Sequence, residues 1–127
     1  MKRVTAGLLA LAVLATAGGA VAGLTSFQEV VVGSNYAYGT LVGARHSADN
    51  VQYIGCFSSV GPTGAYSAYC YARNAAGTSK SCNAAHVEQR NQMRAVNPSS
   101  RIYFEVGTDG SSCSRLMIDN VSAYVDY

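Results

Sequence analysis

The sequence predicts a small α+β domain built mainly from antiparallel strands, with one helix. From Glu29 onward, turn-forming residues recur about every ten residues, and the runs between them are rich in valine, isoleucine, tyrosine and phenylalanine, which is typical of hairpin strands. One stretch, residues 83–96, contains no glycine, proline or aromatic residue and is rich in helix-forming side chains. We therefore expect about five to seven strands in hairpins and one helix near 83–96. The alternative is an all-β sandwich in which that stretch is a loop with a single helical turn.

The expected strands follow the chain in order. The clearest hairpin brackets Gly61-Pro62-Thr63-Gly64, and a second brackets Thr108-Asp109-Gly110. Gly39 and Gly43 lie inside one expected strand, where they indicate a bulge or a close approach of another backbone. The expected strands are residues 28–32, 36–45, 51–57, 66–73, 102–106, 114–119 and, more weakly, 121–125.

The expected helix has recognisable start and stop signals. Asn83 is a candidate N-cap, and Asn97-Pro98 follows the last helix-forming residue. Its apolar stripe is thin, so we expect only one edge of this helix to pack against the domain.

The N-terminus has the pattern of a secretory signal peptide. Lys2 and Arg3 precede an apolar run of about ten residues, and small residues follow at Ala20-Val21-Ala22. We expect residues 1–22 to be removed and residues 23–127 to form a single disulfide-bonded globular domain. The apolar run is shorter than the roughly 20 residues that a membrane-spanning helix needs. We therefore expect a secreted or periplasmic protein that does not stay in a membrane.

Composition limits the classes of partner. The chain has 127 residues, 13% of them charged, and a net charge of +2 that Lys2 and Arg3 account for entirely. Acidic and basic residues therefore balance after residue 22, which argues against a nucleic-acid partner.

All four cysteines, Cys56, Cys70, Cys82 and Cys113, lie beyond the signal peptide. An even number in a small exported domain predicts two disulfides, and none of the gaps has the close spacing of a zinc site. Three pairings are possible. A hairpin symmetric about Thr63 opposes Cys56 to Cys70, with small apolar residues on their face of the hairpin and aromatic residues on the other. Our first choice is therefore Cys56–Cys70 with Cys82–Cys113.

The sequence contains no recognisable catalytic motif. His46 lies three residues before Asp49 and His86 two residues before Glu88, but neither spacing defines a catalytic pair, and on the expected helix His86 and Glu88 do not face each other. We expect no enzyme activity, no cofactor and no metal.

We expect the domain to act through protein, matrix or cell-surface contacts. One alternative is an inhibitor of an extracellular protease that presents the loop 58–64, held at its base by a disulfide. A small secreted hydrolase using His46 or His86 is the least favoured option. The candidate binding loop consists of Ser59, Val60, Gly61, Pro62 and Thr63.

Tyrosine is the one residue type in clear excess, with nine copies and no tryptophan. A high strand propensity explains most of them. The functional alternative is a flat aromatic face that binds carbohydrate, peptide or another copy of the chain.

Overall fold

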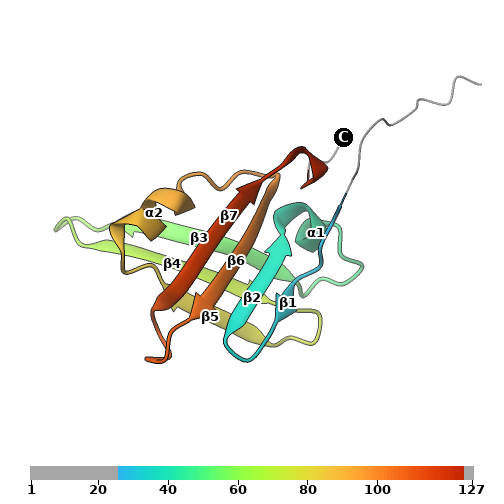
Figure 1. Cartoon of the computed structure of the whole chain (residues 1–127), viewed down its shortest axis with the longest axis horizontal. Helices are drawn as coiled ribbons and strands as arrows, with labels where there is room; N and C mark the ends of the chain where they lie inside the picture. The colour runs from blue at the N-terminus through green and yellow to red at the C-terminus, as the bar shows by residue number, and fades with distance from the viewer. Residues whose placement is uncertain (1–25, 125–127) are drawn as a thin grey trace, which may run out of the picture.

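Two antiparallel sheets face each other in the structure, a computed structural model that describes residues 26–124 (Figure 1). One sheet has four strands in the order β1-β2-β6-β7, and the other has three in the order β3-β4-β5. The predicted α+β class is confirmed, whereas the predicted signal peptide lies outside the described residues. The elements are β1 (Val31–Val32), β2 (Tyr36–Thr40), α1 (Leu41–Arg45), β3 (Tyr53–Val60), β4 (Tyr66–Arg73), β5 (Ser79–Asn83), α2 (Val87–Met93), β6 (Ser100–Val106), β7 (Cys113–Asn120) and a 3-10 turn (Ser122–Tyr124).

The core lies between the two sheets, whose strands run in clearly different directions (Figure 1). The four-stranded sheet contributes the largest buried side chains, among them Phe104 and Ile102, which have no exposed surface. The three-stranded sheet contributes mostly small ones, so the two layers can approach closely. Burying a side chain such as Phe or Ile stabilises a fold by about 1.5–3 kcal/mol. The other buried core residues of the two sheets are Ala37, Leu116, Ile54, Ala68, Cys70, Ala72, Cys82 and Cys113.

The β3–β4 hairpin has the predicted register. Tyr53 pairs with Arg73, Cys56 with Cys70, and Val60 with Tyr66, so the ladder is symmetric about Thr63. Strand β3 continues to Val60, three residues beyond the expected end. At the turn, the backbone N–H of Gly61 donates to the carbonyl of Ala65 at 2.7 Å, and Gly64 has a φ of +79°. That angle is in the left-handed region that favours glycine.

The expected strand 36–45 is wrong in its second half, because the chain turns into helix α1 at Leu41. Thr40 is the N-cap, and its buried hydroxyl accepts a hydrogen bond from the N–H of Gly43 at 3.0 Å. A Cβ built on Gly43 would lie 2.2 Å from the carbonyl oxygen of Gln28. The close backbone approach expected at this glycine is therefore present, but in a helix.

Residues 79–86 also differ from expectation. Strand β5 pairs with β4 over residues 79–83, so Asn83 ends a strand and does not cap a helix. Helix α2 begins at Val87 with His86 as its N-cap. Strand β5 is not predicted from the sequence because all its side chains are polar except that of Cys82, which is buried in the core. Strand β1 covers only the last part of the expected 28–32, and residues 122–124 of the expected 121–125 strand form a 3-10 turn, while residue 125 lies outside the described residues.

Candidate functional site

The solvent side of the three-stranded sheet carries a continuous group of aromatic side chains. Residue alternation places Tyr53 and Phe57 of β3 beside Tyr69 and Tyr71 of β4, opposite the core. Ring centroids lie 5.6 Å apart for Tyr53 and Tyr71, 5.8 Å for Tyr69 and Tyr71, and 5.2 Å for Phe57 and Tyr69. We call these four residues the outer aromatic face. Three of them expose 37–45% of their surface, which is high for side chains of this size.

The outer aromatic face encloses a shallow hollow. The ring of Tyr71 leans across Gly55 of the neighbouring strand, and a hollow of about 330 Å³ opens between Tyr53, Tyr69 and Tyr71. Ser79, Lys80 and Ser81 of β5 line its other side. The hollow therefore combines aromatic walls with hydroxyl groups, which suits a ligand that is part apolar and part polar.

The outer aromatic face has almost no formal charge around it. No acidic residue occurs between Asp49 and Glu88 in the sequence, and on the outer side of the sheet Arg73 is the charged residue. Lys80 also lines the hollow, but its Nζ donates to the carbonyl of Ser34 at 2.7 Å. The remaining outward side chains are small and polar: Ser59, Ser67, Ser79, Ser81 and Asn83.

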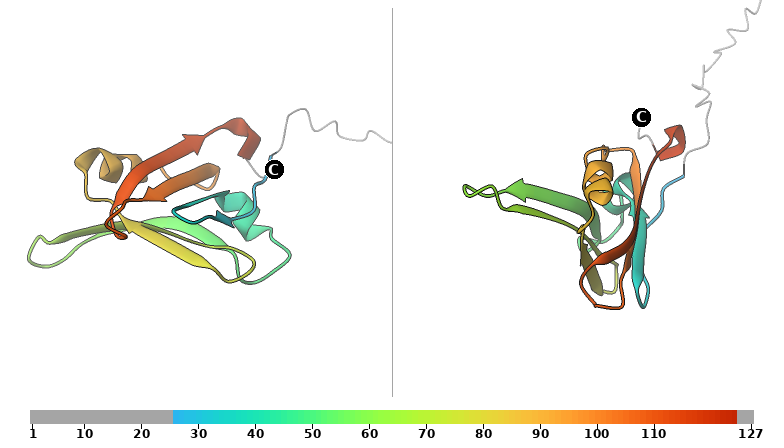
Figure 2. Two further views of the ribbon diagram at one scale, coloured as in Figure 1. Left: turned by 60° about the horizontal axis from the view of Figure 1, so that its bottom comes forward. Right: turned by 60° about the vertical axis from the view of Figure 1, so that its left-hand side comes forward.

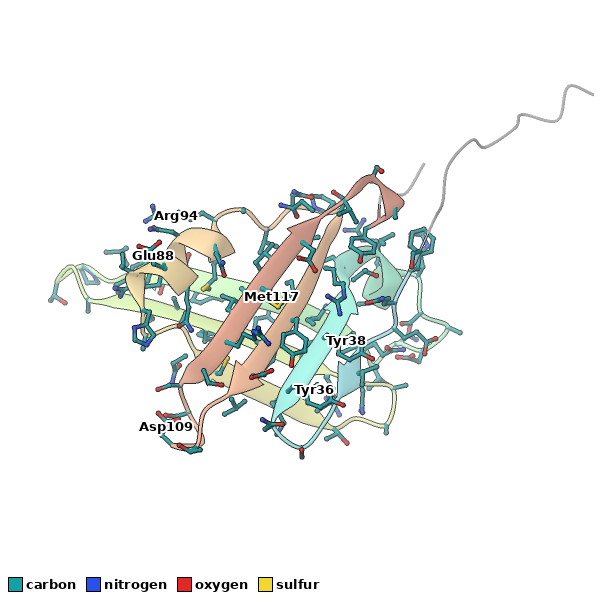
Figure 3. The ribbon with its side chains drawn as sticks, viewed as in Figure 1. Tyr36, Tyr38, Glu88, Arg94, Asp109 and Met117 are labelled. Carbon is teal, nitrogen blue, oxygen red and sulfur yellow. A yellow bond between two sulfur atoms is a disulfide. The ribbon has the colours of Figure 1, made fainter. Side chains whose placement is uncertain are left out.

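A second group of tyrosines lies on the four-stranded sheet, and these side chains pack against one another and against an arginine. Tyr36, Tyr38 and Tyr103 stack side by side with ring centroids 6.2–6.4 Å apart. Figure 3 labels Tyr36 and Tyr38 on β2. The guanidinium of Arg101 lies 5.3 Å from the ring centre of Tyr38 and pairs with Asp119 at 3.0 Å. These side chains bind one another, so strand propensity and cross-strand packing account for this face.

One hydroxyl of this second group is held by a carboxylate. Tyr103 donates a hydrogen bond to Glu105, and that bond raises the pKa of Tyr103 above its ordinary value. The tyrosine hydroxyl thus stays protonated and bound, which is a structural role.

The structure joins Cys56 to Cys70 and Cys82 to Cys113, the pairing that the sequence favours. The first bridge crosses the β3–β4 hairpin, where the two Cα atoms are 4.0 Å apart. The second ties the end of β5 to the start of β7 and so links the two sheets. Two disulfides in a domain of this size are consistent with an extracellular or periplasmic location.

The predicted binding loop 58–64 is part strand and part turn. Residues Ser58–Val60 belong to β3 and are paired with β4, and only Gly61, Pro62 and Thr63 lead into the turn. The end of this hairpin reaches well beyond α2 and the four-stranded sheet (Figure 2). Val60 is 66% exposed there. The candidate loop is therefore the tip of a projecting two-stranded arm.

The two histidines are placed apart from each other in the fold. His46 follows α1 and stacks on Phe27, with ring centroids 6.1 Å apart. His86 lines a surface hollow of about 450 Å³ together with Asp109, Ser112 and Ser114.

That hollow does not assemble a catalytic triad. Asp109 accepts hydrogen bonds from the backbone N–H groups of Ser111 and Ser112 at 3.0 and 2.9 Å, so its carboxylate is committed to its own turn. Hydrogen bonding by the Ser112 side chain and by these N–H groups lowers the pKa of Asp109 to about 2. A carboxylate of that pKa is a weak base. Within residues 26–124, no group of three or more potential metal ligands comes together.

Sequence reasoning placed all four members of the outer aromatic face on one side of the hairpin but explained them by strand propensity. It missed Ser79, Ser81 and Asn83, because it did not recognise β5 as a strand.

Comparison with protein-family models, curated protein sequences and solved structures found no match to this chain. Among residues 26–124, no helix is both long and apolar enough to span a bilayer.

Proposed function

We propose that this chain is an exported, non-enzymatic binding domain that contacts a protein partner through the outer aromatic face. The observation that carries the proposal is the make-up of that face: four clustered rings, small hydroxyl and amide side chains, one arginine and no carboxylate. Surfaces that bind proteins are enriched in Tyr, Phe and Arg and depleted in Lys, Glu, Asp, Ser and Ala, so the rings, the arginine and the missing carboxylates fit this composition and the serines do not.

The physical reason for this preference is that a tyrosine side chain offers a large contact area and has few rotatable bonds to restrict. Binding surfaces rich in Tyr, Ser, Gly and Asn use rigid rings for contact area and short polar groups for adaptable hydrogen bonds. Here the rings of Tyr53, Tyr69 and Tyr71 also support one another. Less side-chain entropy is then lost when a partner is bound.

The predicted export of this chain agrees with the same proposal. The signal-peptide pattern at residues 1–22 and the two disulfides fit a protein that works outside the cytoplasm. A partner would then be an extracellular, periplasmic or cell-surface protein.

The test compares a variant of the outer aromatic face with a control variant on the other sheet, at two positions of equal exposure. Tyr69 and Met117 are each 37% exposed but lie on opposite sheets. Mature protein is immobilised, and the retention of proteins from the producing cells' extracellular fraction is quantified. We expect Tyr69→Ala to weaken retention at least about tenfold, as for a central interface residue, and Met117→Ala to leave it unchanged.

Equal retention by both variants, with melting temperatures like that of the wild type, would overturn the proposal. Loss of retention in Met117→Ala alone would move the site to the four-stranded sheet.

A second candidate function is inhibition of an extracellular protease by the hairpin tip. The observation that favours it is the projection of Ser59–Pro62 on an arm that the Cys56–Cys70 bridge braces. Titration against a panel of secreted proteases tests it. Inhibition that Val60→Asp abolishes and Tyr69→Ala preserves would establish this alternative.

A further inference from the structure

Strand β3 is an open edge of its sheet. It pairs with β4 on one side, and within residues 26–124 no strand pairs with its other side. The short Cα distance at Cys56–Cys70 marks a pair that does not exchange backbone hydrogen bonds. By alternation, the N–H and C=O groups of Cys56, Ser58 and Val60 therefore point away from β4.

Two further contacts support this assignment. The Ala68 carbonyl, opposite Ser58 in the ladder, accepts from Ala84 at 2.9 Å on the side away from β3. Gly61 donates to Ala65 across the hairpin, as the alternation requires of an odd-numbered residue. The backbone groups of Ser58 and Val60 thus form a row of unused donors and acceptors along the projecting arm.

The strand itself carries none of the residues or irregularities that normally block strand addition, and its last four residues, 57–60, are exposed. Natural edge strands carry lysine, proline or bulges, or are covered by a helix or loop, so that another chain cannot pair with them. Strand β3 contains no lysine or proline, and its ladder with β4 runs without a register shift. Helices α1 and α2 both lie near β3, so the edge offered to another chain is its exposed end at Ser58 and Val60. The whole stretch from Asn50 to Ala72 has no charged side chain.

We propose that β3 pairs antiparallel with β3 of a second copy of this chain, forming one six-stranded sheet across the dimer. A two-fold axis at Ser58 places Cys56 opposite Val60 of the second copy and allows about six backbone hydrogen bonds. The exposed Val60 side chain is then covered. Because the arm extends away from the body, two arms can overlap with the two bodies at opposite ends (Figure 2).

The uncharged stretch favours a second copy over other occupants of the edge. Two identical strands with lysine or glutamate along them would repel each other, whereas Asn50–Ala72 can lie beside its own copy without repulsion. The pairing is two-fold symmetric and uses the single free edge of each β3, so the assembly is a closed dimer and does not grow further. This inference does not depend on the proposed partner of the outer aromatic face.

The test is sedimentation of the mature, oxidised protein over a range of concentrations. We expect a monomer–dimer equilibrium in the wild type. Ser58→Pro removes one outward N–H without touching the β3–β4 ladder, since proline is tolerated on a strand edge. We expect it to shift the equilibrium to monomer, and Val60→Lys to do the same.

The matched control is Ser67→Lys, which adds the same charge to β4, away from the edge. We expect it to dimerise like the wild type. A wild-type chain that stays monomeric at millimolar concentration, a folded Ser58→Pro variant that still dimerises, or open-ended oligomers would overturn the proposal.

Discussion

The ring of Tyr71 lies across Gly55 of the neighbouring strand, with its hydroxyl oxygen 3.3 Å from where a Cβ would stand on that glycine. The hollow in the outer aromatic face therefore depends on a missing side chain. Any larger residue at this position has to displace the Tyr71 ring.

Gly55→Val is expected to reshape the hollow while leaving the fold intact. The atoms it meets belong to the free end of a tyrosine side chain, so the ring moves and the backbone does not. Valine also suits a strand better than glycine. We expect the melting temperature to change by only a few degrees and partner retention to fall. Retention equal to that of the wild type would show that the hollow is not part of the contact.

Both disulfides are expected to contribute strongly to stability. Their sequence separations are 14 and 31 residues, and closing loops of these sizes stabilises a fold by about 3 and about 4 kcal/mol. A thiol reductant should therefore lower the melting temperature by well over ten degrees or unfold the domain. A reduced protein that melts within a few degrees of the oxidised one would show that the core suffices alone.

Single cysteine variants test the pairing itself. We expect Cys82→Ala to match Cys113→Ala in melting temperature, because each breaks the bridge between the two sheets. Cys82→Ala behaving instead like Cys70→Ala would contradict this pairing. Oxidised wild-type protein should show no free thiol after denaturing alkylation.

Gly43→Ala is expected to destabilise the domain although alanine is the better helix former. Helix propensity favours alanine by about 1 kcal/mol. The added Cβ would meet the Gln28 carbonyl at 2.2 Å, which forces the backbone apart. Such overpacking typically costs about 1–3 kcal/mol, measurable by chemical denaturation. Gly61→Ala is the control, since its nearest neighbour would lie at 3.6 Å, and we expect it to be near neutral.

Asp109 is expected to make the domain sensitive to acid. Hydrogen bonding by Ser112 and Ser111 lowers the pKa of Asp109 to about 2 in the folded chain, below its ordinary value of 3.8. The unfolded chain therefore binds more protons between these values, and stability is lost as the pH falls from about 4 to about 2. Asp109→Asn should lose less stability across that interval. Parallel pH dependences of the melting temperature in the two proteins would contradict this.

Export is expected to remove the first 22 residues. Intact-mass measurement of extracellular or periplasmic protein should find a chain that starts close to Gly23. A full-length cytoplasmic chain as the only product would contradict the signal-peptide prediction.

The β3–β4 hairpin was predictable from sequence because local rules determine it. A Gly-Pro-Thr-Gly turn sets the point of symmetry, and strict alternation then assigns every side chain to a face. The pairing of Cys56 with Cys70 and the shared face of Tyr69 and Tyr71 follow from the same rules.

Helix α1 and strand β5 were not predictable in the same way. Helix α1 has only five residues, and it depends on the Thr40 cap and on a backbone contact between Gly43 and Gln28 that no local pattern records. Strand β5 has polar side chains and is held by its ladder with β4 and by the Cys82 bridge. Long-range contacts override local propensity in both. The hydroxyl side of the candidate site was missed for that reason.

Cys70 is the cross-strand partner of a cysteine on each neighbouring strand, Cys56 on β3 and Cys82 on β5. In a newly made, reduced chain, two thiols are therefore in register to pair with Cys70. The two loops are of similar length, 14 residues to Cys56 and 12 to Cys82, so loop-closure entropy does not select between them. The ladder does, because Cys56 and Cys70 form a pair without backbone hydrogen bonds, in which the Cα atoms approach to 4.0 Å, whereas Cys70 and Cys82 lie on a hydrogen-bonded pair, where the Cα atoms stand farther apart. Once Cys56 has captured Cys70, the remaining thiol of β5 can reach only Cys113. The strand register thus favours this pairing over one that joins Cys70 to Cys82.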